Sequence, residues 1–311
     1  MLILTVTPNL ALDITYEVDR LRVSATHRVR RVRQRAGGKG VNVARVLRAL
    51  GATPVIAGLA GGPTGTAIRA ELAEAGFCDA LTPIAGESRR TVTIVSELDA
   101  DATMLTEPGP AVSPAEWANL RARVTEAAAR ADVVVLSGSL PPGVPDDGYA
   151  QLIRLARDLG ARTILDTSGP ALLAGLTAQP DLVKPNAAEL RAATGIADDL
   201  DAARALAREG TTVVASLGPG GLLAVSDSGS WRARPPRPLA GNPTGAGDAC
   251  VAALALGLAN RASWPNTLVK AVAASAAAVV CPVAGDIDRG LYEHLLADVV
   301  LEELDAAHPH R

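Results

Sequence analysis

Aromatic residues, cysteine and an excess of charge of one sign are all scarce in this sequence. One Phe, three Trp and three Tyr in 311 residues leave few rings to stack on nucleic-acid bases, and a net charge of -3 provides no basic field. The three cysteines, Cys78, Cys250 and Cys281, are too few for a disulfide framework, and no pair has metal-site spacing. We therefore expect no nucleic-acid partner and a reducing compartment, which is the cytoplasm by default.

Long apolar runs are missing as well. The longest covers about residues 271–285, consists mostly of Ala and Val, and is too short to span a bilayer, so it predicts a buried helix. The first residues carry neither the basic region nor the long apolar region of a signal peptide. We expect no membrane partner.

Lysine is nearly absent, although basic residues are not. Of the 30 basic side chains only Lys39, Lys184 and Lys270 are lysines, and the first two lie in the polar motifs described below. An ammonium group is compact and flexible, whereas a guanidinium group is planar and rigid. Unless the pattern is chance, it indicates tasks at Lys39 and Lys184 that arginine does not perform.

What the sequence does contain is a regular alternation of apolar runs and amphipathic stretches. Hydrophobic residues make up 48% and charged residues 20%, as in folded globular proteins. Ser113-Pro-Ala-Glu116 forms a capping-box start for a helix that reaches about residue 130. The alternation predicts an α/β fold in which helices flank a mostly parallel sheet. Buried strands are predicted at residues 2–6, 54–58, 132–137, 162–166, 181–184, 212–217 and 222–225.

Two segments, residues 10–36 and 88–107, are more polar and alternate with period two. They predict a small, half-exposed β-sheet that either covers a site at the strand ends or joins two subunits. The first segment includes the basic run Arg28-Val-Arg-Arg-Val-Arg-Gln-Arg35. This run is either a solvated strand face or a positive rim that attracts an anionic substrate.

A glycine-rich turn leads into an apolar helix at Asn242-Pro-Thr-Gly-Ala-Gly-Asp248. Glycines let backbone amides approach a ligand, and a helix N-terminus favours anions, so this turn can hold a phosphate group. An acidic residue in the first turn of a helix is often only a partner for the helix dipole. Beside a phosphate site, Asp248 is also placed to take a proton from an attacking hydroxyl.

A second glycine turn, Ala36-Gly-Gly-Lys-Gly-Val-Asn42, also precedes a helix. It is not a Walker A motif, because Gly rather than Ser or Thr follows Lys39. It is either a flexible loop with a solvated lysine or a site where backbone amides and Asn42 bind sugar hydroxyls. Asp13 is either a further acceptor for hydroxyls or an ordinary turn residue.

Three more polar motifs follow predicted strands, where α/β proteins usually bind ligands. In Val183-Lys-Pro-Asn-Ala-Ala-Glu189, Asn186 and Glu189 have the spacing of a helix N-cap and its partner. The alternative is that they hold hydrated Mg²⁺ through water, with Lys184 near nucleotide phosphates. The other two motifs are Ser137-Gly-Ser-Leu-Pro-Pro-Gly143 and Ser216-Leu-Gly-Pro-Gly-Gly221.

Together and in this order, the motifs resemble the PfkB carbohydrate kinases of the ribokinase-like superfamily. The resemblance extends from about residue 3 to 285 and includes Asp166-Thr-Ser-Gly-Pro170. Val183-Lys-Pro-Asn186 and Thr106-Glu-Pro-Gly-Pro110 are similar to the branch of the family that acts on hexose phosphates.

This resemblance implies one ribokinase-like kinase domain over residues 1–311, with a Rossmann-like sheet and a β lid from residues 10–36 and 88–107. The lid would join two subunits in a homodimer. ATP with Mg²⁺ would phosphorylate a hydroxyl of a ketohexose monophosphate, with fructose 1-phosphate ranked ahead of tagatose 6-phosphate and fructose 6-phosphate.

The resemblance also assigns roles to residues. Asp248 would be the catalytic base, and the amides of Gly245, Ala246 and Gly247 would hold the transferred phosphoryl group. Arg90 would clamp the phosphate of the substrate. The sugar phosphate would be bound by Asp13, Gly37, Gly38, Lys39, Asn42, Arg90 and Ser139, ATP by Lys184, Asn186, Ser216, Gly218, Gly221 and Thr244, and Mg²⁺ by Asn186 and Glu189 through water.

Three positions depart from the family pattern. Thr26 and Met104 are uncharged where kinases of fructose 6-phosphate tend to have cations, which argues against that substrate. Pro243 occupies a place where Ser, Thr or Val is more usual.

Other functions stay open beside this one. A kinase of an unphosphorylated sugar or a nucleoside would use the same machinery, and a non-catalytic sugar-phosphate sensor would be expected to lack Asp248 or its loop. A dehydrogenase is disfavoured because Cys250 replaces the third glycine of the dinucleotide fingerprint. A hydrolase with Ser137 or Ser139 as nucleophile needs a histidine, and three of the four histidines lie near the C-terminus.

Overall fold

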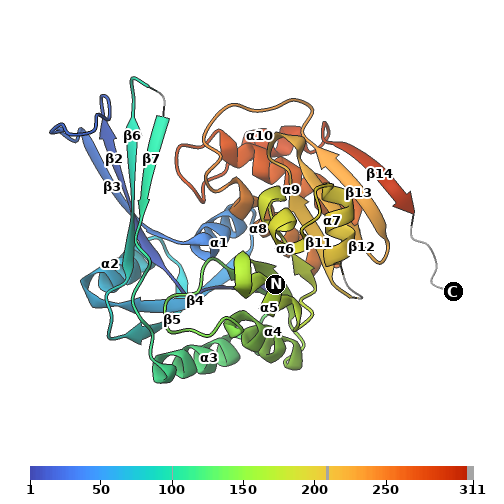
Figure 1. The fold of residues 1–311 in the computed structure, drawn as a ribbon, viewed down its shortest axis with the longest axis horizontal. Coiled ribbons are helices and arrows are strands. Elements are labelled where there is room, and N and C mark those ends of the chain that lie inside the picture. The colour runs from blue at the N-terminus through green and yellow to red at the C-terminus, as the bar shows by residue number, and fades with distance from the viewer. Residues whose placement is uncertain (100, 208–209, 307–311) are drawn as a thin grey trace.

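Two β-sheets organise the molecule, one of ten strands and a separate one of four (Figure 1). The computed structural model describes residues 1–99, 101–207 and 210–306, so Ala100 of the expected lid lies outside the described residues. The large sheet has the order β14 (Val300–Ala306), β13 (Gly229–Arg234), β12 (Leu222–Ser226), β11 (Thr212–Ser216), β10 (Leu182–Val183), β9 (Arg162–Asp166), β8 (Val133–Ser137), β1 (Leu2–Thr7), β4 (Thr53–Gly61) and β5 (Cys78–Ile84).

The strands from β11 to β5 in this order are all parallel, which confirms the predicted mostly parallel sheet. The seven predicted strands are all present. The sheet also has three strands that the sequence did not predict, β5, β13 and β14. Of these, β5 and β14 are the two edge strands and β13 is next to β14, and β12, β13 and β14 pair antiparallel. Edge strands are half exposed and therefore lack the continuous apolar run of a buried parallel strand.

Ten helices surround the sheets in the described residues. Ser113 and Glu116 form both hydrogen bonds of the predicted capping box, and the helix they open ends at Ala128. The helices are α1 (Lys39–Ala49), α2 (Gly62–Glu74), α3 (Pro114–Ala128), α4 (Gly148–Asp158), α5 (Gly169–Leu176), α6 (Ala187–Thr194), α7 (Asp199–Leu206), α8 (Ala246–Ala259), α9 (Trp264–Val279) and α10 (Arg289–Leu295).

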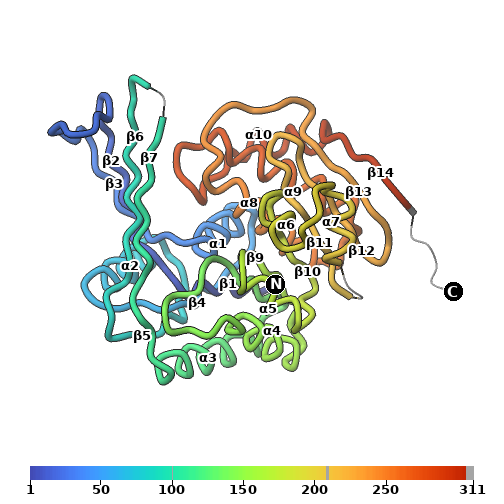
Figure 2. Tube along the Cα trace, in the orientation of Figure 1, coloured from blue at the N-terminus to red at the C-terminus, as the bar shows by residue number. Residues whose placement is uncertain are grey.

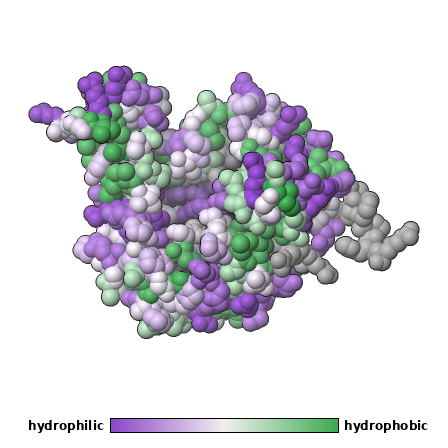
Figure 3. Space-filling view, in the orientation of Figure 1, coloured by the Kyte–Doolittle hydropathy of each residue, from purple (hydrophilic) through white to green (hydrophobic). Residues whose placement is uncertain are grey.

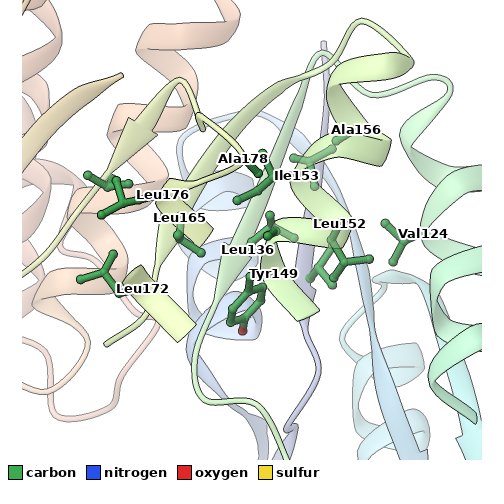
Figure 4. Packing of buried hydrophobic residues seen from close by; sticks show 14 of the residues in the cluster. Val124, Leu136, Tyr149, Leu152, Ile153, Ala156, Leu165, Leu172, Leu176 and Ala178 are labelled. Atoms are coloured by element: carbon green, nitrogen blue, oxygen red, sulfur yellow. The ribbon is translucent and has the colours of Figure 1, made fainter. Parts of the chain in front are cut away.

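Two hydrophobic cores form on the two faces of the large sheet, because successive residues of a strand point to opposite faces. Val134 and Leu136 of β8 pack with α3 to α7, and Figure 4 shows Leu136 with Leu165 of β9 on one side and Leu152 of α4 on the other. Their neighbours Val133 and Val135 pack on the other face with α1, α8 and α9. The result is a sheet covered by helices on both faces, as the alternating pattern predicted.

The predicted buried helix at residues 271–285 is α9, but α9 ends at Val279. Ala284 and Gly285 therefore lie in the loop that follows it and approach the site described below. Among the described residues, no helix has both the length and the apolar character needed to span a membrane.

The four strands of the small sheet come from the two segments that the sequence singled out. They are β3 (Arg31–Gly37), β2 (Ala11–Val18), β6 (Arg89–Ser96) and β7 (Asp101–Thr106), in that order. β2 follows β1 after three residues, and β3 leads into α1 after Gly38. These connections anchor the small sheet at the carboxyl end of β1, and it rises beside the body of the molecule (Figure 2).

Candidate active site

Polar residues gather at the carboxyl ends of the parallel strands, which is where open α/β sheets bind ligands. Asp166 ends β9, Lys184 follows β10 directly, and Ser216 ends β11. The face drawn in Figure 3 is hollowed between the small sheet and the part that contains α8, α9 and α10. The strand ends, the small sheet and the N-terminus of α8 thus meet around one site.

Asp248 lies in the first turn of α8 and is buried, with 7% of its surface exposed. The side-chain amide of Asn42 donates a hydrogen bond of 2.8 Å to its Oδ2. Burial, and after it the nearby Asp166 carboxylate, raise the pKa of Asp248. The hydrogen bond from Asn42 and the charges of Lys39 and Lys184 lower it, and the net pKa is about 7. A carboxylate with a pKa near neutrality is suited to accept a proton at physiological pH.

The turn before Asp248 presents the start of a helix to this space. Gly245 has φ of 89°, a left-handed conformation that glycine adopts readily, and a Cβ there would lie 2.8 Å from Cα of Ala284. The first amides of a helix have no partner within the helix. The amide of Ala246 nevertheless donates to the carbonyl of Pro243 at 3.2 Å, so it is already engaged. Because any residue type would supply this backbone carbonyl, the bond does not explain the proline at position 243.

Asp166 brings Lys39 and Lys184 together. Nζ of Lys184 lies 3.2 Å from Oδ1 of Asp166. Nζ of Lys39 lies 3.2 Å from Oδ2 and donates a hydrogen bond of 3.3 Å to the same Oδ1. Burial alone would raise the pKa of Asp166, but the two ammonium groups outweigh it and lower that pKa. The segment that begins at Asp166 is part of the family resemblance, but no role was predicted for Asp166. The scarcity of lysine was the available signal, since two of the three lysines of the chain bind this one carboxylate.

Asp13 lies at the base of the small sheet, against the glycine turn that precedes α1. A Cβ on Gly37 would lie 1.9 Å from Oδ2 of Asp13, so only glycine leaves room for this carboxylate. Burial raises the pKa of Asp13 to about 6, although Arg89 and a hydrogen bond from Thr91 lower it. Gly40 donates its amide to the hydroxyl of Thr7 at 2.8 Å, which fixes the turn to the end of β1.

Arg90 does not join these residues, but its neighbour Arg89 does. In the pairing of β2 with β6, Arg89 is opposite Ala11 and Thr91 is opposite Asp13. Because side chains alternate between faces, Arg89 shares the face of Asp13 and Arg90 points to the other face. There the half-exposed Arg90 forms an ion pair with Glu107 at 3.3 Å.

The basic run of the small sheet is paired with acidic residues. Arg31 and Arg33 both contact Glu17, and Arg30 contacts Asp19 and Glu97. Arg35 binds Asp286 at 2.7 Å, next to the loop that follows α9. These partners largely neutralise the proposed positive rim, so the solvated-face interpretation describes most of the run better.

A cavity of about 560 Å³ opens beside Arg89 and Ser139. Asn9 crosses its base and donates to the Ser139 hydroxyl at 3.1 Å and to the Pro108 carbonyl at 3.0 Å. Tyr149 supports the loop below by donating to the carbonyl of Gly138 at 3.0 Å. Ser139 therefore lies on a well-anchored turn at one end of the site.

A second cavity, of about 610 Å³, lies on the other side, between the β11–β12 turn, the Pro243 turn and α9. It brings together Asn186, Ser216, Gly218 and Gly221, which the sequence assigned to ATP, and the helix start at Gly247. Most of its remaining wall is small and apolar, and no sequence motif predicted this part. These further residues are Pro219, Leu222, Pro235, Pro238, Leu239, Ala240, Gly241, Pro243, Ala246, Val272, Ser275, Ala276 and Val279.

Asn186 and Glu189 form the capping box of α6. Asn186 Oδ1 accepts from the amide of Glu189 at 2.8 Å, and Glu189 Oε2 accepts from the amide of Asn186 at 2.9 Å. The ordinary capping interpretation therefore holds. No group of three His, Cys, Asp or Glu side chains in the described part of the chain could hold a metal ion directly.

Comparison with known proteins identifies the family of this chain. Residues 7–288 match the pfkB family of carbohydrate kinases. The chain belongs to this family. As a member it is a sugar kinase that uses ATP as phosphoryl donor, and the combination of glycine turn and buried Asp248 at the strand ends is consistent with that chemistry.

Two relatives and one solved structure are similar to most of this chain. A 1-phosphofructokinase of Rhodobacter capsulatus is 42% identical over 259 residues, 81% of this chain and 82% of the relative. A 1-phosphofructokinase of Xanthomonas campestris is 39% identical over 270 residues, 84% and 85% of the two chains. The crystal structure of phosphofructokinase-2 from Escherichia coli in complex with potassium superposes with a TM-score of 0.90 at 32% identity, covering 95% of this chain and 98% of that one. This likeness confirms the ribokinase-like α/β fold.

Proposed function

We propose that this kinase transfers a phosphoryl group from ATP to a free hydroxyl of a ketohexose monophosphate, and that fructose 1-phosphate is the favoured acceptor. Asp248 carries the argument for the chemistry, because it is buried, has a pKa of about 7 and accepts a hydrogen bond from Asn42 of the Ala36–Asn42 glycine turn. The names of the two relatives at 42% and 39% identity support the choice of substrate.

In this proposal Asp248 takes the proton of the attacking hydroxyl, and the amides of Gly245 and Gly247 stabilise the transferred group. The amide of Ala246 would contribute only if it left the Pro243 carbonyl. Asp13, Gly37, Gly38, Lys39, Asn42 and Ser139 would bind the sugar. Lys184, Asn186, Ser216, Gly218, Gly221 and Thr244 would bind the nucleotide.

We assign the substrate phosphate to Arg89 rather than to Arg90. Arg89 lines the cavity that also contains Ser139, and it shares a face of the small sheet with Asp13. Its Nε donates to the Asn9 carbonyl at 3.2 Å and one terminal nitrogen donates to the Glu107 carbonyl at 3.4 Å, which leaves most of its guanidinium donors for an anion.

Mg²⁺ fits this site as a hydrated ion. The capping box uses one oxygen each of Asn186 and Glu189, and the second carboxylate oxygen of Glu189 stays available for a water ligand of the ion. A bound Mg²⁺ would neutralise charge on the phosphates of ATP.

The small sheet would serve as a lid that also joins two subunits. Val32, Met104 and Leu105 of this sheet are 52%, 49% and 56% exposed, which is unusual for such large apolar side chains in one small sheet. Sedimentation should give a dimer for the wild type and a monomer for Leu105→Asp. Leu301→Asp, on the exposed edge strand β14, is the control and should stay dimeric. A monomeric wild type would overturn this proposal.

ADP release from MgATP across a panel of acceptors tests the substrate assignment. The panel contains fructose 1-phosphate, tagatose 6-phosphate, fructose 6-phosphate, fructose, ribose and adenosine. We expect fructose 1-phosphate to exceed the free sugars in kcat/KM by at least about 100-fold, the value of charge-assisted hydrogen bonds from a half-buried guanidinium to a phosphate. A free sugar or nucleoside as the best acceptor would refute the proposed substrate and the role of Arg89.

A further inference from the structure

One buried charged group is not used by the chemistry above. Asp166, at the end of β9, is 1% exposed and is the shared partner of Lys39 and Lys184. A buried carboxylate needs a single cation to balance its charge. With two ammonium groups, the cluster retains a net positive charge, in the place where the two halves of the site meet.

The two lysines come from different halves of the site. Lys39 is the first residue of α1, in the turn next to Asp13 and Asn42, and 41% of its side chain is exposed. Lys184 follows β10 on the nucleotide side, and only 5% of its side chain is exposed. Its Nζ would lie 3.7 Å from a Cβ on Gly247, so it faces the phosphate-binding turn of α8.

The electrostatics keep Asp166 and Lys184 charged. Burial alone would lower the pKa of Lys184, but the Asp166 carboxylate outweighs it and raises that pKa. An ammonium group has three donors in free rotation and can share one carboxylate oxygen with a second ammonium. A planar guanidinium in place of either lysine would not fit this shared geometry as well, which accounts for two lysines in a chain otherwise rich in arginine.

We propose that Asp166 is a positioning residue: its carboxylate holds Lys39 from the sugar side and Lys184 from the nucleotide side at the phosphate-binding turn. This inference rests on the proposed function, because it assumes that Asp248 is the base and that phosphate groups lie at this turn. The cluster sets both the position of the two cations and the proton affinity of the base.

The charged groups that act on Asp248 have opposing effects. Asp166 of β9 raises its pKa, whereas Lys39 of α1 and Lys184 after β10 lower it, as does the hydrogen bond from Asn42. On α9, which packs along α8, Lys270 is exposed to solvent. Removing Asp166 or Lys39 should therefore shift the ionisation of Asp248 in opposite directions.

The test is the pH profile of kcat/KM at saturating MgATP for Asp166→Asn and Lys39→Met. Loss of the like charge should move the acid limb of Asp166→Asn down by about one pH unit or more, and loss of the ammonium should move that of Lys39→Met up. We also expect kcat of Asp166→Asn to fall about 10- to 100-fold at the plateau, because misplaced cations no longer meet the phosphoryl group. Thermal unfolding checks that both variants fold.

A merely structural role for Asp166 would lower activity equally at all pH values. Acid limbs that do not move, or that move in the same direction in both variants, would overturn the proposal. If Asp166→Asn does not fold, Lys39→Met alone decides by the direction of its shift.

The profile is recorded with whichever panel acceptor gives the highest kcat/KM, so a different substrate would refute the proposed function and leave this test intact. An NMR titration of ¹³C-labelled aspartate, with Asp248→Asn to assign the signal, gives the same pKa without turnover. An Asp248 signal that titrates identically in wild type and Asp166→Asn would count against the inference even where no acceptor is phosphorylated.

Discussion

Asp13, Lys39 and Arg89 bring full charges to the sugar side of the site, whereas the cavity on the nucleotide side is walled mostly by glycine, proline, alanine and valine. Charged side chains bind through specific, charge-assisted hydrogen bonds. Small apolar residues and glycines instead bind by shape and by exposing the backbone. We infer that recognition of the acceptor depends on a few side chains, and recognition of the nucleotide on the course of the chain.

The two sides meet at Asp248, so this residue should show the largest effect. Asp248→Asn keeps the shape and the contact with Asn42 but cannot accept the proton. We expect kcat to fall by about 10²–10⁴-fold, the usual contribution of a positioned base, with KM for both substrates little changed. Steady-state kinetics measure this, with the exposed Asp158→Asn as control. A variant within threefold of the wild type would remove Asp248 from the mechanism.

Arg89 and Arg90 form a matched pair on the sugar side, identical in type and adjacent in sequence. Arg89→Ala should raise KM for the sugar phosphate about 10- to 100-fold, the value of a charge-assisted hydrogen bond, and leave KM for ATP unchanged. Arg90→Ala should stay within about threefold, as for other exposed ion pairs. The reverse result would assign the substrate phosphate to Arg90. It would contradict the placement of the Arg89 side chain, and not that of Arg90, on the face of β6 that carries Asp13.

The pH dependence should also separate the two sides. Below a pH of about 7 Asp248 becomes protonated, so kcat/KM should fall about tenfold per pH unit, and above it the rate should reach a plateau. Asp13, with a pKa of about 6, becomes neutral next, which should weaken sugar binding further. No titratable side chain is among the described residues that line the nucleotide cavity, so KM for ATP should stay flat. A KM for ATP that follows the same limb would contradict this division.

The smallest effect is expected where shape alone decides. Ser275 of α9 lines the nucleotide cavity and is half-buried. Ser275→Leu should raise KM for ATP about 5- to 10-fold, at the lower end of the cost of overpacking, without changing KM for the sugar phosphate. Ser275→Ala is the matched control and should behave as wild type. An equal loss with both variants would mean that the hydroxyl, and not the shape of the wall, binds the nucleotide.

Much of the fold could be predicted from the sequence, because the signals are local. Continuous apolar runs identified all seven predicted strands, and the period-two segments identified the small sheet. The capping box at Ser113 and the glycine turns before Asp248 and Asn42 also depend on neighbouring residues alone. The strands β5, β13 and β14 were missed, since exposed residues interrupt the apolar run in each of them.

Only the tertiary structure decided how distant charges pair. Nothing in the sequence joins Lys39, Asp166 and Lys184. Asp166 ends β9 and Lys184 follows β10, which are neighbours in the parallel sheet, whereas Lys39 begins α1 after a strand of the small sheet. Nor does the sequence distinguish Arg89 from Arg90, because in a sheet with two polar faces the alternation does not say which face is which. The pairing of Asp13 with Thr91 makes that distinction. Local motifs could thus be predicted from the sequence. The sheet face to which a side chain points and the charge that it pairs with depend on strand register, which is set by the whole packed sheet.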